Sequence, residues 1–364
     1  MIINLKKTHI LFVLYFVFFS GHISVWAQYD TLRLVFTGDI MGHTPQIKSA
    51  ETAPGQYDYK PCFQYVAPLL RDADLAIGNL EVTLPGKAPY TGYPMFRSPD
   101  ALADALKDAG FDLLVTANNH SNDSRGTGVK NTIETVREAG FLQTGTFRNQ
   151  QERDLFYPLI VYKNDFKLAF LNYTYGTNGI PTEAPTIVNL IDTVQMAVDI
   201  AEAKARKPHF VIAVMHWGLE YQLTENAEQR ALARFLIRQG VDMIIGMHPH
   251  VVQPVKMETV GSKKVLVAYS LGNFISNQQQ AHTDGGIVME VELLRKKGAP
   301  TAQLGAYRYI PVWRYIHKAG AKTTFYALPE SLLEHIERFP DMSAAARDKM
   351  SQFIAALHKR LAKS

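Results

Sequence analysis

The segment Met243-Ile244-Ile245-Gly246-Met247-His248-Pro249-His250 is an apolar run that ends in two histidines separated by a proline. The apolar part predicts a buried β-strand over residues 243–245 that ends at Gly246. Two imidazoles at positions i and i+2 in a fixed loop can bind one metal ion or two adjacent ions. The segment therefore predicts a strand that delivers metal-binding side chains at its carboxyl end.

Polar side chains follow four other predicted strands in the same way. After residues 32–36, 75–77, 113–115 and 210–214 come, in that order, Asp39, Asn79 with Glu81, Asn119 with His120, and His216. In open α/β folds, sites form beyond the carboxyl ends of the strands, so these groups should meet at one rim. Such a mixed set of oxygen and nitrogen donors suits Mn, Fe or Zn, as one ion or two.

Each of these residues also has a plainer interpretation. Asp39 fits a turn that its carboxylate caps, a solitary histidine such as His216 is more often structural than a ligand, and Glu81 alone would be a solvated surface residue. Residues 118–120 argue against the plain interpretation, because three polar side chains directly after an apolar strand are costly unless a partner or a ligand satisfies them.

Apolar strands alternate with amphipathic helices, for example at residues 227–239 before Gly240, and this alternation is typical of a layered α/β fold. After Lys296 the pattern changes. We predict a main domain over residues 28–300 and a mostly helical C-terminal extension over residues 301–364, with an aromatic-rich strand at residues 307–316.

The first 27 residues have the pattern of a signal peptide. Lys6 and Lys7 precede an apolar run at residues 10–19, and Val25-Trp26-Ala27 resembles a cleavage site. We expect cleavage after Ala27 and a location in the periplasm or cell envelope. The alternative is an uncleaved membrane anchor, because residues 10–27 could nearly span a bilayer.

Composition narrows the function classes further. The formal net charge of +4 is too small to indicate a nucleic-acid partner, and no basic stripe with interleaved aromatic residues occurs. Cys62 is the only cysteine, which rules out an internal disulfide and a cysteine-based metal site. Any metal must therefore be held by His, Asp, Glu and Asn.

The motifs together resemble one protein family over about residues 32–294. They are Gly38-Asp39, Asn79-Leu80-Glu81, Ala117-Asn118-Asn119-His120, His216-Trp217-Gly218, Gly246-Met247-His248-Pro249-His250 and Tyr269-Ser270-Leu271-Gly272-Asn273-Phe274. In this order and spacing they resemble the CapA family of capsule and poly-γ-glutamate synthesis proteins. The resemblance implies a four-layer α/β/β/α sandwich of the calcineurin-like metallophosphoesterase type.

The resemblance also implies roles for individual residues. Asp39, Glu81, Asn119, His216, His248 and His250 would be metal ligands, and His120 would protonate the leaving group. Two positions depart from the phosphoesterase pattern: Met41 stands where a histidine is expected, with His43 as a conceivable substitute, and Asn79 stands where the bridging aspartate is expected.

Two functions remain open at this point. In the first, the chain is a metal-dependent hydrolase acting on a phosphoester or a γ-glutamyl amide. In the second, it is a non-catalytic accessory protein that binds an anionic polymer or other capsule-assembly proteins. The intact His120 favours the first function, and the changes at Met41 and Asn79 favour the second.

Overall fold

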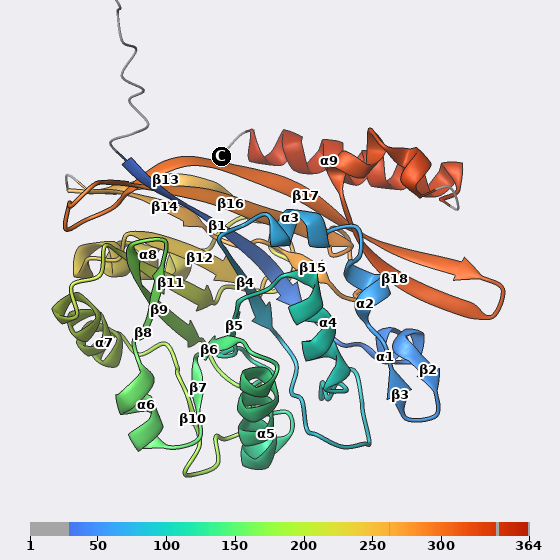
Figure 1. Cartoon of the computed structure of the whole chain (residues 1–364), viewed down its shortest axis with the longest axis horizontal. Coiled ribbons are helices and arrows are strands. Elements are labelled where there is room, and N and C mark those ends of the chain that lie inside the picture. The colour runs from blue at the N-terminus through green and yellow to red at the C-terminus, as the bar shows by residue number, and fades with distance from the viewer. Residues whose placement is uncertain (1–28, 262, 340–341, 363–364) are drawn as a thin grey trace, which may run out of the picture.

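Two β-sheets face each other in the computed structural model, which describes residues 29–261, 263–339 and 342–362 (Figure 1). The predicted signal peptide, residues 1–27, lies outside the described residues. Within the described ranges, no helix is both long enough and apolar enough to cross a membrane.

The first sheet is parallel at one end and antiparallel at the other. Its order is β18 (Lys322–Pro329), β17 (Gln303–Ala319), β16 (Gly285–Lys296), β1 (Tyr29–Ile40), β4 (Leu75–Leu80), β5 (Leu113–Val115) and β6 (Leu142–Thr144), and β15 (Asn273–Ile275) also pairs with β1. Strands β1, β4, β5 and β6 pair in parallel. On its other side β1 pairs with β16 in antiparallel fashion, and so do β16 with β17 and β17 with β18.

The second sheet has a parallel centre flanked by antiparallel edge strands. Its order is β13 (Val255–Val260), β14 (Lys263–Ala268), β12 (Met243–Met247), β11 (Phe210–His216), β9 (Phe166–Thr174) and β8 (Leu159–Lys163). Strands β9, β11, β12 and β14 are parallel, so their carboxyl ends lie at the same edge.

Alternating side chains separate the layers. Along β1, Leu34 and Phe36 enter the core between the sheets, while Val35 enters the outer core of the first sheet. Along β9, Phe170 enters the central core and Leu171 the outer core of the second sheet. This period of two over buried strands is what a sheet covered on both faces requires.

Helices cover both outer faces. The first sheet is covered mainly by α3 (Ala67–Arg71), α4 (Ala101–Ala109) and α5 (Arg125–Glu138), and the second by α7 (Thr193–Ala205) and α8 (Ala227–Gln239). The predicted four-layer α/β/β/α sandwich is therefore confirmed. Smaller elements are α1 (Thr44–Ala50), β2 (Glu51–Ala53), β3 (Gln56–Tyr57), α2 (Lys60–Phe63), β7 (Thr146–Phe147), α6 (Gln150–Phe156) and β10 (Ile187–Val188).

The C-terminal region corrects one prediction. The segment from residue 301 onward is not mostly helical from its start, because β17 pairs with β16 and β18 pairs with β17, which extends the first sheet by two strands. The helical part consists of η2 (Glu330–Leu333), η3 (Ile336–Arg338) and α9 (Ala344–Leu361). Helix α9 lies along β17 in Figure 1, and its Phe353 and Leu357 belong to the central core.

Candidate metal centre

Five side chains from the two sheets meet at the carboxyl edge of the parallel strands. Asp39 lies at the end of β1, Glu81 follows β4, His216 ends β11, and His248 and His250 lie in the loop after β12. Each is at most 3% exposed. The edge therefore collects two carboxylates and three imidazoles from strands that are far apart in the sequence.

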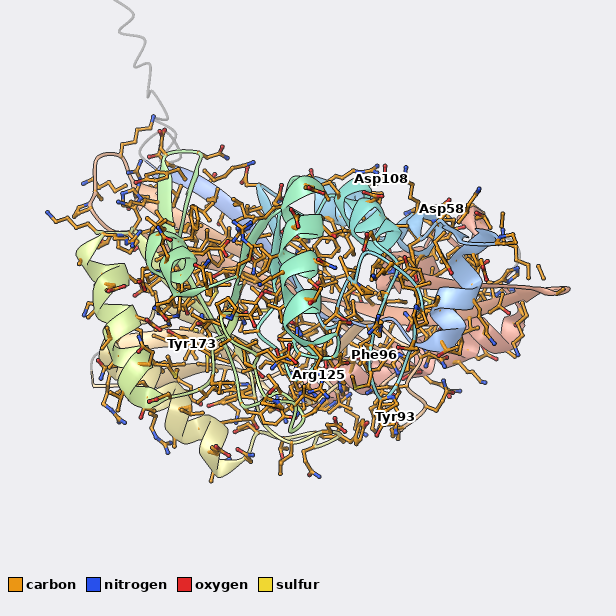
Figure 2. The ribbon with its side chains drawn as sticks, turned by 90° about the horizontal axis from the view of Figure 1, so that it is seen from below. Asp58, Tyr93, Phe96, Asp108, Arg125 and Tyr173 are labelled. Atoms are coloured by element: carbon orange, nitrogen blue, oxygen red, sulfur yellow. The ribbon has the colours of Figure 1, made fainter. Side chains whose placement is uncertain are left out.

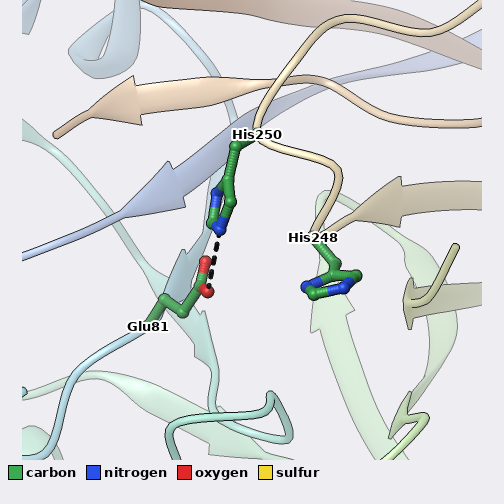
Figure 3. A group of neighbouring side chains, drawn as sticks. All are labelled: Glu81, His248 and His250. Atoms are coloured by element: carbon green, nitrogen blue, oxygen red, sulfur yellow. Dashed lines mark ion pairs between the residues drawn. The ribbon is translucent and has the colours of Figure 1, made fainter. Parts of the chain in front are cut away.

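Glu81 belongs to both donor groups of the cluster, and Figure 3 shows its carboxylate facing the ring of His250. Its Oε1 is 3.7 Å from Nε2 of His216 and 3.7 Å from Nε2 of His250. The described residues form two groups whose donor atoms all lie within 4.8 Å of one another inside the group. One group is Glu81, His248 and His250, and the other is Asp39, Glu81 and His216. Because both groups contain Glu81, this residue occupies the bridging position.

Hydrogen bonding shows whether a cation fits this cluster. Glu81 is fully buried, yet among the described residues neither of its carboxylate oxygens has a hydrogen-bond partner, and Nδ1 of His248 also has none. Leaving a buried carboxylate without a partner is strongly unfavourable. The unsatisfied oxygens and nitrogen therefore fit a site that is completed by a divalent metal ion.

The pKa values fit the same interpretation. Burial, and after it the charge of Asp39, raises the pKa of Glu81 well above its usual range. Burial lowers the pKa of His216 well below its usual range and that of His248 to about 3. Both imidazoles are therefore neutral near pH 7, and a neutral imidazole has the free lone pair that metal coordination requires.

Asp39 differs from Glu81 because it is already hydrogen-bonded. Its Oδ1 accepts a bond from the side-chain amide of Asn79 (2.8 Å), and its Oδ2 accepts one from the backbone N–H of His248 (3.2 Å) and lies 3.1 Å from Nδ1 of His250. Asn79 also lies in the cluster, because its amide nitrogen is 3.3 Å from Nδ1 of His216 as well, whereas the carboxylate shared by both donor groups is that of Glu81.

The second departure from the phosphoesterase pattern is Met41, which offers no metal ligand. Met41 packs in the outer core of the first sheet. His43 does not replace it: among the described residues, neither donor group contains His43. His43 instead caps α1, where its Nδ1 contacts Gln46 and accepts a hydrogen bond from the backbone N–H of Asn277. The suggested substitution by His43 is therefore wrong.

Asn119 and His120 lie beside the cluster. Oδ1 of Asn119 is 2.9 Å from Nε2 of His216, the same nitrogen that approaches Glu81. The charge of His120 contributes, after burial and other nearby histidines, to lowering the pKa of His216, which places His120 near the cluster as well. All seven residues predicted for the site thus lie in one region.

Asp123 is a site residue that sequence reasoning missed. Its Oδ2 lies 2.8 Å from Nδ1 of His120 and also accepts a hydrogen bond from the backbone N–H of Phe96. Phe96 packs edge-on against His120, and in Figure 2 Phe96 lies near Tyr93. The carboxylate fixes the imidazole, so that Nε2 of His120 is left to act on a ligand. The sequence did contain a signal for this pair, because a carboxylate three residues after His120 is close enough to contact its ring.

The loop that carries His248 and His250 has a strained backbone. Both residues have positive φ, 97° and 58°, in the left-handed region that non-glycine residues avoid. A side chain at Gly246 would meet the carbonyl oxygen of Tyr269 at 2.0 Å, so only glycine fits there. Strain of this kind persists where the surrounding structure holds functional groups in place.

The facing sheets, the helices on their outer faces and the carboxylate–histidine cluster at one edge define an α/β/β/α sandwich with a candidate metal centre at the carboxyl ends of its parallel strands. The family described as "Bacterial capsule synthesis protein PGA_cap" matches residues 33–278. The chain belongs to this family.

Individual relatives agree with the family. The chain is 28% identical to the capsule biosynthesis protein CapA of Bacillus anthracis over 84% of its own length and 77% of the relative's. It is 27% identical to the PGA biosynthesis protein CapA of Bacillus subtilis (strain 168), over 80% and 73% of the two lengths.

Among solved structures, the calcineurin-like phosphoesterase YfkN from Bacillus subtilis has a TM-score of 0.48 at 14% identity, with 89% of this chain and 99% of the other covered. The NAD nucleotidase of Haemophilus influenzae also has a TM-score of 0.48, at 13% identity, with 93% and 62% covered. Because both TM-scores are below 0.5, the fold is defined by the two sheets and their helices alone.

Proposed function

We propose that the chain is a metal-dependent hydrolase that acts in capsule or poly-γ-glutamate production. The observation that carries the proposal is the buried carboxylate of Glu81, which has no hydrogen-bond partner and lies between Nε2 of His216 and Nε2 of His250. One or two ions of Mn, Fe or Zn would suit the donor set.

The residues around the cluster have distinct roles in this proposal. Asp39, Glu81, His216, His248 and His250, with Asn119 beside His216, would hold the metal. A bound divalent ion would supply Lewis-acid activation of water and of the scissile group. His120 donates a proton from Nε2 to the leaving group, while Asp123 holds Nδ1 and stabilises the charged imidazole. This chemistry serves a phosphoester or a γ-glutamyl amide.

A second function is favoured by one specific observation. The amide of Asn79 occupies Oδ1 of Asp39, and Met41 offers no ligand, which weakens the first-sheet side of the site. A weakened site would suit an accessory protein that binds an anionic polymer or other capsule-assembly proteins. The dyad of His120 and Asp123 favours hydrolysis, because binding alone requires no proton donor.

A pair of variants tests the proposal. His248→Ala should lower the metal content measured by elemental analysis, whereas His120→Ala should keep the metal and lose turnover by about 100-fold or more. Turnover would be assayed on phosphodiester, phosphomonoester and γ-glutamyl amide probes. Full activity in His120→Ala would contradict its role as the acid, and unchanged metal content in His248→Ala would remove His248 from the ligands.

We further propose that the mature protein is exported and begins at residue 28 after cleavage behind Ala27. This is supported by the sequence pattern, in which Lys6 and Lys7 precede the apolar run at residues 10–19 and Val25-Trp26-Ala27 resembles a cleavage site. Mass determination of the protein recovered from the envelope fraction tests the proposal. A mass that includes residues 1–27 would indicate an uncleaved anchor instead.

A further inference from the structure

A cavity of about 410 Å³ opens beside the candidate metal centre, on the side of the second sheet. It is lined by residues that follow β9, β10, β11 and β12 and by the first turns of α8. His248 forms part of its wall, and the Nδ1 atom of His248 is buried without a hydrogen-bond partner. The cavity and the metal centre therefore share a side chain.

The walls of this cavity are apolar with an acidic margin. Ile191, Leu219 and Leu232 contribute aliphatic surface, and Tyr175 contributes an aromatic ring whose centroid is 4.5 Å from that of His248. The charged side chains in the lining are those of Glu220 and Glu228, and among the described residues that line the cavity there is no lysine or arginine.

Glu220 lies in the loop after β11, close in sequence to His216 of the cluster, and both Glu220 and Glu228 are exposed. The hydroxyl of Tyr175 donates a hydrogen bond to Oδ1 of Asn178, so Tyr175 offers its ring rather than its hydroxyl to a ligand. The polar group of Gln229 is also satisfied: its side chain bonds Gln253 and the backbone N–H of Asn226. The charged groups that the lining offers to a ligand are therefore the carboxylates of Glu220 and Glu228.

We propose that this cavity binds a positively charged ammonium group of the substrate while the scissile bond lies at the metal centre. Two carboxylates attract a cation and repel the carboxylates of an anionic chain, and an aromatic ring stabilises a desolvated ammonium group. The inference rests on the proposed function, because it takes the cluster as the reacting centre. It assigns to Glu220, Glu228 and Tyr175 the selection of an amine-bearing end over an internal, purely anionic stretch.

The test measures binding and needs no turnover. Benzylamine and benzyl alcohol share a ring and differ in charge at neutral pH, so they would be titrated into the mature chain by ligand-observed NMR. Benzylamine should bind about tenfold more tightly than the alcohol, and its affinity should fall with added salt. Equal affinity for the two compounds would overturn the proposal.

Variants locate the binding. The double variant Glu220→Gln/Glu228→Gln should lose the preference for benzylamine and leave the affinity for benzyl alcohol unchanged. Glu134→Gln, an exposed position on α5 outside the cavity, is the matched control and should retain the preference. An undiminished preference in the double variant would contradict the assignment.

The outcome is separable from that of the hydrolase proposal. If His120→Ala abolishes turnover and still binds benzylamine, both proposals hold. If no hydrolysis is found but the charge preference depends on Glu220 and Glu228, the cavity binds cations in a non-catalytic protein. If turnover is found without any charge preference, the hydrolase proposal stands and the cavity proposal is wrong.

Discussion

The two sheets contribute unlike halves to the metal centre. The second sheet supplies His216 and His248, whose pKa values burial lowers, and leaves Nδ1 of His248 without a partner. The first sheet supplies Asp39, whose two oxygens are both hydrogen-bonded, and Glu81, whose oxygens are not. Glu81 is therefore the group of the first sheet that most needs a bound ion to compensate its burial.

Of the substitutions in the metal centre, replacement of Glu81 should change the Mn affinity most. Glu81→Gln should weaken Mn binding by about 100-fold or more, since even a residue that only orients a metal ligand is typically worth roughly 10–100-fold. Because the buried charge is removed, the metal-free variant should be at least as stable as the metal-free wild type. Calorimetric titration with Mn and thermal melts with and without Mn measure the two effects.

The control for this prediction is Glu134→Gln, which changes an exposed glutamate outside the cluster. In this control, Mn should raise the melting temperature as in the wild type. A Glu81→Gln protein that binds Mn with wild-type affinity would show that Glu81 is not a ligand and that the two halves do not meet on it.

Asn79 allows the weaker half to be strengthened. Asn79→Asp replaces an amide that bonds Asp39 at 2.8 Å with a second carboxylate, so Mn should bind about tenfold more tightly. Without metal, the two carboxylates repel each other, and the free energy of unfolding should fall by roughly 1–3 kcal/mol. Asn79→Ser removes the amide without adding a charge and separates the two causes. Unchanged or weaker Mn affinity in Asn79→Asp would contradict this account.

His43 gives the smallest effect and tests whether the first-sheet side holds a hidden imidazole ligand. Burial lowers its pKa from 6.5 to about 4, so the unfolded chain binds more protons than the folded chain between these values. The free energy of unfolding should therefore decrease as the pH falls through this window, and His43 alone should account for about 1–2 kcal/mol near about pH 5.

Urea unfolding of the wild type and of His43→Gln over this pH range measures the contribution as the difference between the two curves. Because His43 lies outside both donor groups, adding Mn should leave that difference unchanged. Parallel curves without metal would show that His43 does not titrate as a buried histidine, and a difference that grows with Mn would make it a ligand.

Much of the fold follows from local patterns. Helix α8 occupies Ala227–Gln239 as predicted, and Gly240 after it has φ of 114°, because an amphipathic stretch closed by glycine is a local signal. The strand predicted at residues 307–316 is the middle of β17, whereas β18 was missed. The sequence also did not show that β17 pairs with β16 and extends the first sheet, because a pattern along the chain does not show which edge of a sheet is free.

The site was predictable as a set of residues but not as a set of interactions. Strand ends brought together Asp39, Glu81, Asn119, His120, His216, His248 and His250. That Asn79 donates to Asp39 is decided by a contact between strands remote in sequence. The contact of Asp123 with His120 and the position of His43 at the start of α1 are local, but the sequence alone did not show which side chains these residues contact. The acidic cavity likewise depends on how Tyr175 packs against His248.

The pairing of β1 has a consequence for how the chain acquires its structure. Residues Tyr29 to Phe36 pair with Lys296 to Met289, so the first strand completes the sheet only with a partner from far along the chain. Such non-local pairing makes folding slow and leaves little for an emerging N-terminal segment to fold against. Metal binding should consequently occur late in refolding, together with the final cooperative step, so its time course would report when that step takes place.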